Sequence, residues 1–288
     1  MKNSISLHVS VITCLVLLAA GNSAADSFDR LETEVRPIPL ERSGGAFVEL
    51  EGGTGWIYLL HGGLPAVLNA KPVSDVWVFD GSDWSSVAVA APAVYGHALV
   101  AAGEGRAYGF GGVNLNDELI RLDRVLSYRV RQGSAGPEVI IDEIEVPGPN
   151  PGTCSEAPVV WFENTDSMLL VGGMCSYFPG WSSEVWEYRI GDNAWQRRAD
   201  LPHALADHTT VVTNGQVWVF GGRGAAGRSN EVYRYDPQSD SWSEVVANGT
   251  LPEPLSDHRA VAIGDSMVVF GGIRDNFWPE TIPEVWEL

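Results

Sequence analysis

The chain has little positive charge. It carries 18 Lys and Arg residues against 37 Asp and Glu residues, for a formal net charge of −19. Lysine is nearly absent, since only Lys2 and Lys71 occur and the other basic residues are arginines. A protein that neutralises nucleic-acid phosphates needs a basic face, so this composition argues against nucleic-acid binding.

Long hydrophobic runs are also scarce. The clear one spans residues 9–20, with Lys2 before it and the small residues Ser23, Ala24 and Ala25 after it. This pattern is typical of a secretory signal peptide, and the run is shorter than the roughly 20 residues needed to cross a bilayer. We therefore expect residues 1–25 to be a signal peptide, the mature chain to comprise residues 26–288, and the protein to be secreted or periplasmic, with no membrane span.

Glycine, proline and tryptophan are plentiful, at 32, 17 and 11 residues. This turn-forming content argues against a helical bundle. A hydrophobic fraction of 45% with 10% aromatics is enough to build a core, which excludes a disordered chain. The composition favours an acidic, turn-rich β-protein.

One pattern occurs five times. A short hydrophobic run ends in Gly-Gly at residues 62–63, 111–112, 172–173, 221–222 and 271–272. A second strand beginning with an acidic residue follows, at Asp75, Glu118, Glu184, Glu231 and Glu284. In three units a strand before the Gly-Gly opens with a histidine (His97, His208, His258), and in three a later strand carries a tryptophan (Trp84, Trp195, Trp242). Each unit therefore predicts four short strands joined by turns.

These units resemble the kelch repeat, which is about 50 residues long and forms one four-stranded blade of a β-propeller. The resemblance implies an all-β fold of about five blades in a single domain. The last unit stops after its third strand, so we expect residues 31–39 to supply its fourth strand and close the ring. A truncated six-bladed ring remains an alternative. Residues 124–137 account for the longest repeat and predict an extended hairpin whose outer strand lacks the tryptophan.

The antiparallel strands assign the loops to faces. The loops after Gly-Gly, the links between blades and the starts of the inner strands share one face. From the first glycine to the acidic residue of the next strand, the spacings are 13, 7, 12, 10 and 13 residues. Variable loops on a rigid frame are where binding residues usually lie, so this face is the candidate site.

Arginines and aromatics gather in those loops. The predicted ligand-binding residues are Arg223, Arg228, Arg274, His97, Tyr177, Trp181, Phe277 and Trp278. Asp207, His208, Asp257 and His258 are candidates for acid–base chemistry. Arginine would grip a carboxylate while an aromatic ring stacks on a sugar-like ligand. Alternatively, the histidines form hydrogen bonds between blades and the aromatics cap the end of the propeller or contact a protein.

The remaining motifs are few. After signal removal two cysteines are left, Cys154 and Cys175, at opposite ends of a predicted antiparallel pair. In an oxidising compartment they are expected to form a disulfide, with free thiols as the alternative. His61 occupies a slot that is apolar in the other repeats and is interpreted as a core residue. No metal or cofactor is expected, because the histidines lack short-spaced ligand partners.

Two functional hypotheses follow. In the first, the protein is a monomeric binding module for a protein partner or a small anionic or sugar-like ligand. In the second, it is a small isomerase, since exported kelch propellers similar to it include bacterial sialic acid mutarotases. There, Asp or His would move protons while Arg held the carboxylate.

Overall fold

The computed structural model describes residues 42–43, 46–52, 55–65, 70–114, 120–134, 136–175, 180–246, 249–274 and 284–288. Over these residues the chain forms five antiparallel sheets in sequence order. The first contains β2 (Ala46–Gly52), β3 (Gly55–His61), β5 (Val76–Phe79) and β6 (Trp84–Val87). The second contains β7 (Ala98–Ala101), β8 (Arg106–Phe110), β11 (Val125–Gly133) and β12 (Gly136–Ile144).

The other three sheets repeat this order. The third contains β14 (Val159–Phe162), β15 (Ser167–Val171), β17 (Val185–Arg189) and β18 (Ala194–Arg198). The fourth contains β19 (Thr209–Thr213), β20 (Gln216–Phe220), β23 (Val232–Asp236) and β24 (Ser241–Glu244). The fifth contains β25 (Arg259–Ile263), β26 (Ser266–Phe270) and β27 (Val285–Glu287). Glu163–Thr165 form a 3₁₀ turn between β14 and β15.

Four short strand pairs lie outside the five main sheets. They are β1 (Arg42–Ser43) with β4 (Leu64–Pro65), β9 (Val113–Asn114) with β10 (Ile120–Arg121), β13 (Cys154–Ser155) with β16 (Met174–Cys175), and β21 (Arg223–Gly224) with β22 (Gly227–Arg228). These pairs involve the loops after Gly-Gly and the links that enter the blades. The candidate face is therefore built partly from regular hydrogen-bonded backbone.

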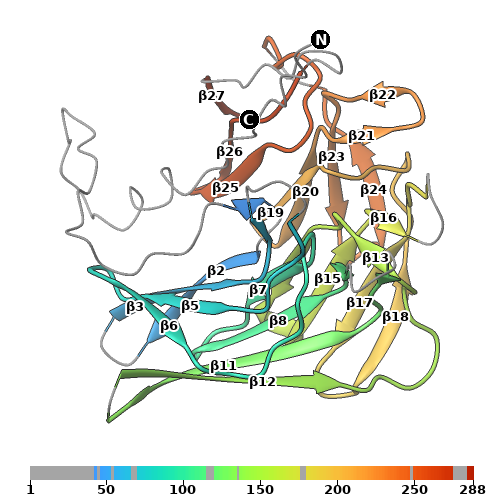
Figure 1. Ribbon diagram of the computed structural model, residues 1–288. Helices are drawn as coiled ribbons and strands as arrows, with labels where there is room; N and C mark the ends of the chain where they lie inside the picture. The colour runs from blue at the N-terminus through green and yellow to red at the C-terminus, as the bar shows by residue number, and fades with distance from the viewer. Residues whose placement is uncertain are drawn as a thin grey trace, which may run out of the picture.

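The sheets are the blades of a five-bladed β-propeller. The first strand of each blade contacts the first strand of the next, in the order β2, β7, β14, β19 and β25. The colours of Figure 1 run from the blue first sheet to the red last one in the same succession. The fifth blade has three strands within the described part of the chain, and the predicted fourth strand at residues 31–39 lies outside it.

The hydrophobic core lies between neighbouring blades. Val48 and Val76 of the first blade pack in one cluster with Leu126 of the second. Leu169 of the third blade packs in another with Val217 of the fourth. Burial alternates along strands such as β20, as expected where successive side chains point to opposite faces. Each blade that lies between two others is therefore stabilised by packing against both of them.

The third strand of the second blade begins later than expected. Val125, rather than a residue near Glu118, pairs with Phe110, while Ile120 belongs to the side pair β9–β10. Arg124 takes the position that an acidic residue has in the other blades: its carbonyl accepts the Gly111 N–H at 3.2 Å. The predicted spacing of 7 residues, from Gly111 to Glu118, is therefore wrong, and the equivalent spacing from Gly111 to Arg124 is 13. The loops after Gly-Gly are much more uniform in length than predicted. The extended hairpin is confirmed, since β11 and β12 have nine residues each.

The Gly-Gly pairs join the blades. The N–H of the second glycine donates to a carbonyl in the link that enters the next blade. These bonds run from Gly63 to Val94, Gly112 to Cys154, Gly173 to Leu205 and Gly222 to Leu255, each with an N···O distance of 2.7 Å. At Gly173, where φ is +99°, a Cβ would lie 2.2 Å from the Cβ of Ala157. Glycine is required there both for the positive φ and for this close approach.

His61 makes a polar link in its otherwise apolar slot. Its Nδ1 is 2.7 Å from the hydroxyl of Tyr128, and its Nε2 is 3.0 Å from the carbonyl of Pro92. Because a carbonyl only accepts, Nε2 carries the proton and the Tyr128 hydroxyl donates to Nδ1. Both partners belong to the second blade or its entering link, so this buried histidine joins two blades. The prediction that it is a core residue agrees with its zero exposure.

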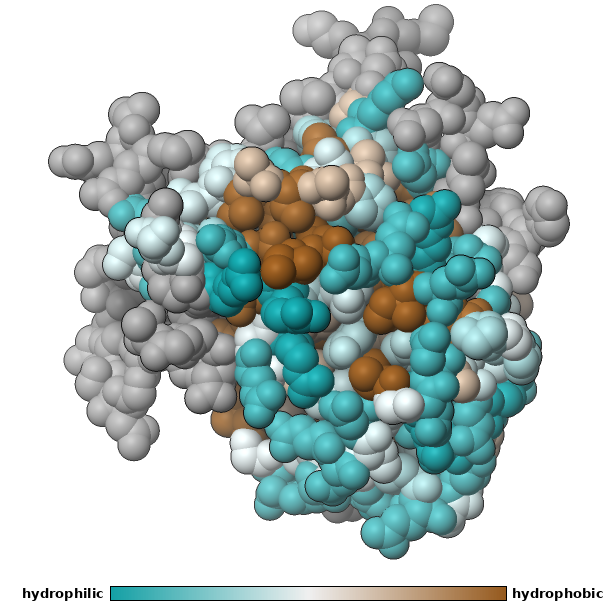
Figure 2. Space-filling model, turned by 90° about the horizontal axis from the view of Figure 1, so that it is seen from below, coloured by the Kyte–Doolittle hydropathy of each residue, from teal (hydrophilic) through white to brown (hydrophobic). Residues whose placement is uncertain are grey.

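Figure 2 shows hydrophilic side chains over much of the described part of the face seen from below, together with a central hydrophobic cluster and smaller hydrophobic patches beside it. Within the described part of the chain, no helix is long and apolar enough to cross a membrane.

We predict that Gly173→Ala lowers the free energy of unfolding more than Gly103→Ala does. Both glycines have positive φ, but a Cβ at Gly103 meets nothing within 4 Å. The difference isolates the collision with Ala157 and is expected to be about 1–3 kcal/mol. Urea unfolding of both variants measures it. Equal losses would mean that the close contact between Gly173 and Ala157 within the third blade does not require glycine.

Candidate functional site

Three carboxylates occupy equivalent positions just before the first strands of the third, fourth and fifth blades. They are Glu156, Asp207 and Asp257, and their φ angles are 52°, 56° and 60°. Gly96 holds the same position in the second blade with a φ of 65°. We call these carboxylates, with Arg223 and Arg259, the axial cluster, and the face on which they lie the axial face.

The backbone explains the positive φ angles. The N–H of Glu156 donates to the carbonyl of Gly96 at 2.9 Å, that of Asp207 to Glu156 at 3.4 Å, and that of Asp257 to Asp207 at 3.0 Å. This ladder passes from blade to blade. In the second blade a glycine, Gly96, adopts the positive φ that the ladder requires. A residue with a side chain pays about 1–2 kcal/mol of conformational energy for the same left-handed backbone. The ladder of backbone hydrogen bonds therefore does not require carboxylates at these positions. Residues with a strained backbone of this kind concentrate at functional sites.

Two arginines from the β21–β22 hairpin hold two of the carboxylates, Arg223 directly and Arg228 through the hydroxyl of Ser256. The Nε of Arg223 donates to Oδ2 of Asp207, whose side chain is 3% exposed while that of Arg223 is 43% exposed. The Nε of Arg228 donates to Oγ of Ser256 at 2.8 Å, and that hydroxyl donates to Oδ2 of Asp257 at 2.8 Å. The hairpin thus fixes both carboxylates, and Arg223 also faces solvent.

Burial and mutual repulsion change the proton affinity of the cluster. Burial, followed by the charges of Asp207 and Asp257, raises the pKa of Glu156 to about 7, although Arg259 and Arg223 act in the opposite direction. Burial and Asp257 likewise raise the pKa of Asp207, and Arg223 opposes them. Near neutral pH, Glu156 can therefore donate as well as accept a hydrogen bond.

The three predicted histidines lie in the junctions between blades. His97, His208 and His258 are 7%, 4% and 1% exposed. Each packs its Cβ near the second glycine of its own blade and its ring near the first glycine of the preceding blade. The Nε2 of His258 lies 3.1 Å from the carbonyl of Phe220 in the preceding blade. For His258 this is the hydrogen bond between blades that the alternative predicted, whereas the ring nitrogens of His97 and His208 have no hydrogen-bond partner in the described part of the chain.

Burial keeps these rings neutral. It lowers the pKa of His208 to about 3, with a further contribution from His258. Burial also lowers the pKa of His258 to about 4, against the opposing Phe220 carbonyl, and lowers that of His97 well below its usual value. At neutral pH the rings therefore add no charge to the axial face.

The other predicted ligand-binding residues are more scattered. Trp181 is half-buried and pairs with Met174 through the backbone, and its indole nitrogen is buried with no hydrogen-bond partner in the described structure. The Nη1 of Arg274 lies 3.4 Å from Oε2 of Glu253. Tyr177, Phe277 and Trp278 lie outside the described residues.

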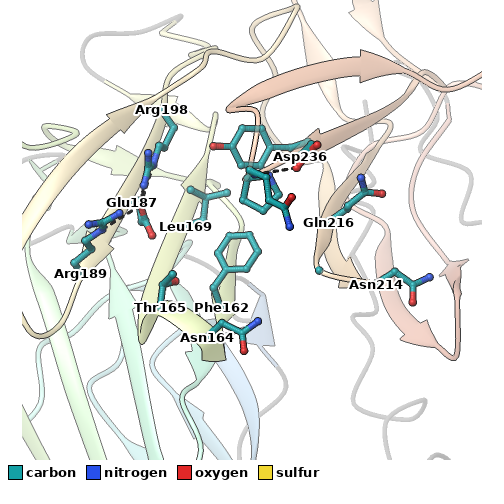
Figure 3. Close-up of a pocket in the computed structure, with 14 residues that line it drawn as sticks. Phe162, Asn164, Thr165, Leu169, Glu187, Arg189, Arg198, Asn214, Gln216 and Asp236 are labelled. Atoms are coloured by element: carbon teal, nitrogen blue, oxygen red, sulfur yellow. Dashed lines mark hydrogen bonds and ion pairs between the residues drawn. The ribbon is translucent and has the colours of Figure 1, made fainter.

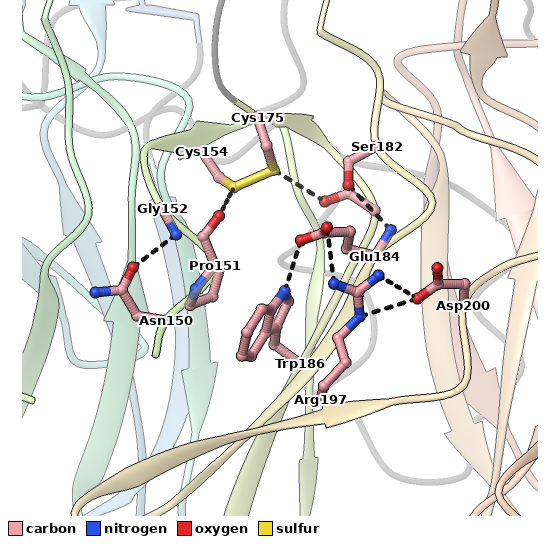
Figure 4. A network of polar contacts seen from close by, with 11 residues as sticks. Asn150, Pro151, Gly152, Cys154, Cys175, Ser182, Glu184, Trp186, Arg197 and Asp200 are labelled. Carbon is pink, nitrogen blue, oxygen red and sulfur yellow. Dashed lines mark hydrogen bonds and ion pairs between the residues drawn. A yellow bond between two sulfur atoms is a disulfide. The ribbon is translucent and has the colours of Figure 1, made fainter. Parts of the chain in front are cut away.

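The predicted disulfide is present between Cys154 and Cys175, which are directly opposite in the β13–β16 pair. The Cys154 carbonyl accepts the Gly112 N–H, so the bridge ties the junction of the second and third blades to the loop that leads to Trp181. Figure 4 shows the polar network beside it, in which Glu184 accepts hydrogen bonds from Trp186 and pairs with Arg197. The bridge therefore braces the axial face.

Sequence reasoning missed two members of the cluster. Glu156 is followed by Ala157 instead of histidine, so the acid–histidine pattern of the fourth and fifth blades passed over it. Aligning the units on their first strands, rather than on histidine, would have found it. Arg259 opens β25 and carried no signal beyond its charge. Among the described residues, no group of three or more His, Cys, Asp or Glu side chains is arranged to hold a metal ion.

Comparison with known proteins gives a consistent family match. Residues 96–288 match the KLHDC2/KLHL20/DRC7 Kelch-repeats domain. Beta-scruin of Limulus polyphemus is 31% identical over 113 residues, covering 37% of this chain and 12% of that protein. The Rab9 effector protein with kelch motifs of Bos taurus is 30% identical over 128 residues, covering 42% of this chain and 33% of that protein.

A longer but weaker match is Kelch domain-containing protein 3 of Rattus norvegicus. It is 25% identical over 209 residues, which cover 68% of this chain and 53% of that protein. The matches thus span from about an eighth to about half of these relatives' own lengths. They bear on the repeats that the proteins share rather than on the whole of any relative.

We predict that Glu156→Gln raises the melting temperature at pH 8 and changes it little at pH 5. The pKa of Glu156 is about 7 in the folded protein, above the usual value of 4.5. The folded state therefore holds a proton that the unfolded state has lost between these values, and this stabilisation disappears as the pH rises through 7. Glutamine mimics the protonated form at every pH.

Thermal unfolding at both pH values measures the effect, with exposed Glu163→Gln as the control. The control is expected to leave the melting temperature unchanged at both values. An equal effect of Glu156→Gln at pH 5 and pH 8 would contradict the raised pKa.

We predict that reducing the disulfide lowers the free energy of unfolding by up to about 3 kcal/mol, because the bridge restricts the unfolded chain. The two cysteines are 21 residues apart in the sequence. Urea unfolding with and without reductant measures the loss. The double variant Cys154→Ser/Cys175→Ser should already be less stable and should not respond to reductant. A wild-type protein that is equally indifferent to reductant would refute the prediction.

Proposed function

Because the chain belongs to the family of kelch-repeat β-propellers, we propose that it is a protein-interaction module that binds its partner through the axial face. Kelch propellers typically bind proteins, and the relative named as a Rab9 effector is named for a protein that it serves. The observation that carries the proposal is that three residues at equivalent blade positions combine a carboxylate with a positive φ.

The axial cluster has the groups that a polypeptide contact uses. Glu156 can donate or accept, and Arg223 offers a partly exposed guanidinium held in place by Asp207. Arginine held in this way loses less conformational freedom when it binds. A partner segment with peptide groups and a basic side chain fits this mixture of donors and acceptors.

The charge of the whole chain favours a basic partner. A formal net charge of −19 attracts positively charged surfaces over distances of about a Debye length, and this attraction raises association rates at low salt. The disulfide favours a compartment that is oxidising. With residues 1–25 acting as a signal peptide, the proposed site of action is outside the cytoplasm.

A second candidate function is acid–base catalysis on an anionic sugar. The observation that favours it is the pKa of about 7 at Glu156, since a group that is half protonated at the working pH transfers protons efficiently. Arg223 lies close enough to influence Glu156 and could hold a carboxylate. The buried histidines do not take part in this version of the mechanism.

The test uses immobilised full-length mature protein to capture a partner from the surrounding medium, followed by measurement of its affinity. Arg223→Ala is expected to weaken binding by about tenfold, equivalent to about 1.4 kcal/mol. Arg131→Ala on the β11–β12 hairpin is the matched control, because Arg131 is also exposed and paired with an acid, Glu138. The control should bind like the wild type.

Two outcomes oppose the proposal. If Arg223→Ala and Arg131→Ala weaken binding equally, the axial face is not the contact surface. If no protein is captured but an acidic sugar raises the melting temperature and its anomers interconvert faster with the wild type than with Glu156→Gln, the second candidate replaces the first.

A further inference from the structure

A cavity opens between the third and fourth blades, on the face opposite the axial cluster. Its volume is about 460 Å³, within the range of small-molecule sites. The turn after β14, the turn between β19 and β20, and the turn after β23 form its rim. Figure 3 shows side chains from both blades pointing toward this space, with Phe162 and Leu169 on one side and Gln216 and Asp236 on the other.

The charged side chains that line the cavity balance in number, since Arg189 and Arg198 face Glu187 and Asp236. Glu187, whose side chain is 5% exposed, accepts hydrogen bonds from Ser167 and Arg198 and lies 3.4 Å from Nε of Arg189. Burial alone would raise the pKa of Glu187, but the bonds from Ser167 and Arg198 outweigh it and hold the pKa below its usual value. Asp236 accepts the backbone N–H of Gln238. The cavity therefore offers no strong net charge to a ligand.

The uncharged polar side chains at the rim include four amides. The side chains of Asn164, Asn214, Gln216 and Gln238 line the cavity, and none makes a side-chain hydrogen bond within the described structure. Each amide offers a donor and an acceptor together. Phe162 is half-buried at the same rim and presents part of a ring. Paired donors and acceptors around an aromatic ring match a ligand with several neighbouring hydroxyls.

We propose that this cavity binds a neutral saccharide of one to a few rings. The hydroxyls exchange hydrogen bonds with the four amides, and a sugar ring packs its C–H face on Phe162. A charged sugar is disfavoured, because Arg198 and Glu187 already satisfy each other and Asp166 and Asp192 stand beside Arg189 in the adjacent depression. This site is independent of the proposed protein contact, since it shares none of the residues of the axial cluster.

The experiment is a calorimetric titration of full-length mature protein with maltotriose, cellotriose and triacetylchitotriose, and with glucuronic acid and glucosamine as charged comparators. At least one neutral trisaccharide is expected to bind, with an affinity that hardly changes between about 0.05 M and 0.5 M salt. Asn164→Ala and Gln216→Ala are each expected to weaken binding by about tenfold. Gln196→Ala is the matched control, because Gln196 is exposed on β18 and does not line the cavity.

Three results would overturn the proposal. They are the absence of binding by every neutral trisaccharide at about 10 mM, a concentration well above typical site affinities, stronger binding of a charged comparator, and binding that survives both Asn164→Ala and Gln216→Ala. Urea unfolding of each variant checks that the fold is intact. Variants of the axial cluster should leave saccharide binding unchanged, so the two proposals can fail separately.

Discussion

The structure depends on the hydrogen bond that the second glycine of each of the first four Gly-Gly pairs donates to the link of the next blade. These four bonds are equally short, and each ends where the neighbouring blade begins its first strand. They bring the blades close enough to share hydrophobic clusters, and a Cβ at the neighbouring Gly172 would lie only 2.7 Å from the Leu205 carbonyl oxygen that accepts the Gly173 N–H. Because each blade buries its faces against its neighbours, the stability of one blade depends on both junctions beside it.

The same junctions arrange the two surfaces that carry function. On the axial face, the ladder from Gly96 to Asp257 sets the carboxylates in a row, while the histidines beside them are buried as packing groups. On the opposite face, the turns of two neighbouring blades leave a cavity whose acidic and basic side chains balance in number. One face therefore offers ionisable groups to a partner, and the other offers neutral amides.

Repetition made much of the fold predictable. Gly-Gly at nearly constant spacing requires repeated turns and close approaches, and this is enough to predict blades, their number and the position of the disulfide. Prediction was wrong where the repeat was degenerate. Residues 118–120 imitate the usual acidic start of a third strand, but the pairing of Val125 with Phe110 decides the register. Similarly, Ala157 replaces the histidine that would have pointed to Glu156.

The sequence by itself determined the local requirements of this protein: glycines where no side chain fits, alternating strands, and cysteines at opposite ends of a pair. These follow from steric and hydrophobic rules that act within one repeat. Only the tertiary structure decided which groups from different blades meet. Glu156 has a pKa of about 7 because the fold buries it and brings Asp207 and Asp257 near it, and His61 is satisfied because Tyr128 reaches it across a junction. Burial and charge act through distance, which the order of residues along the chain does not specify.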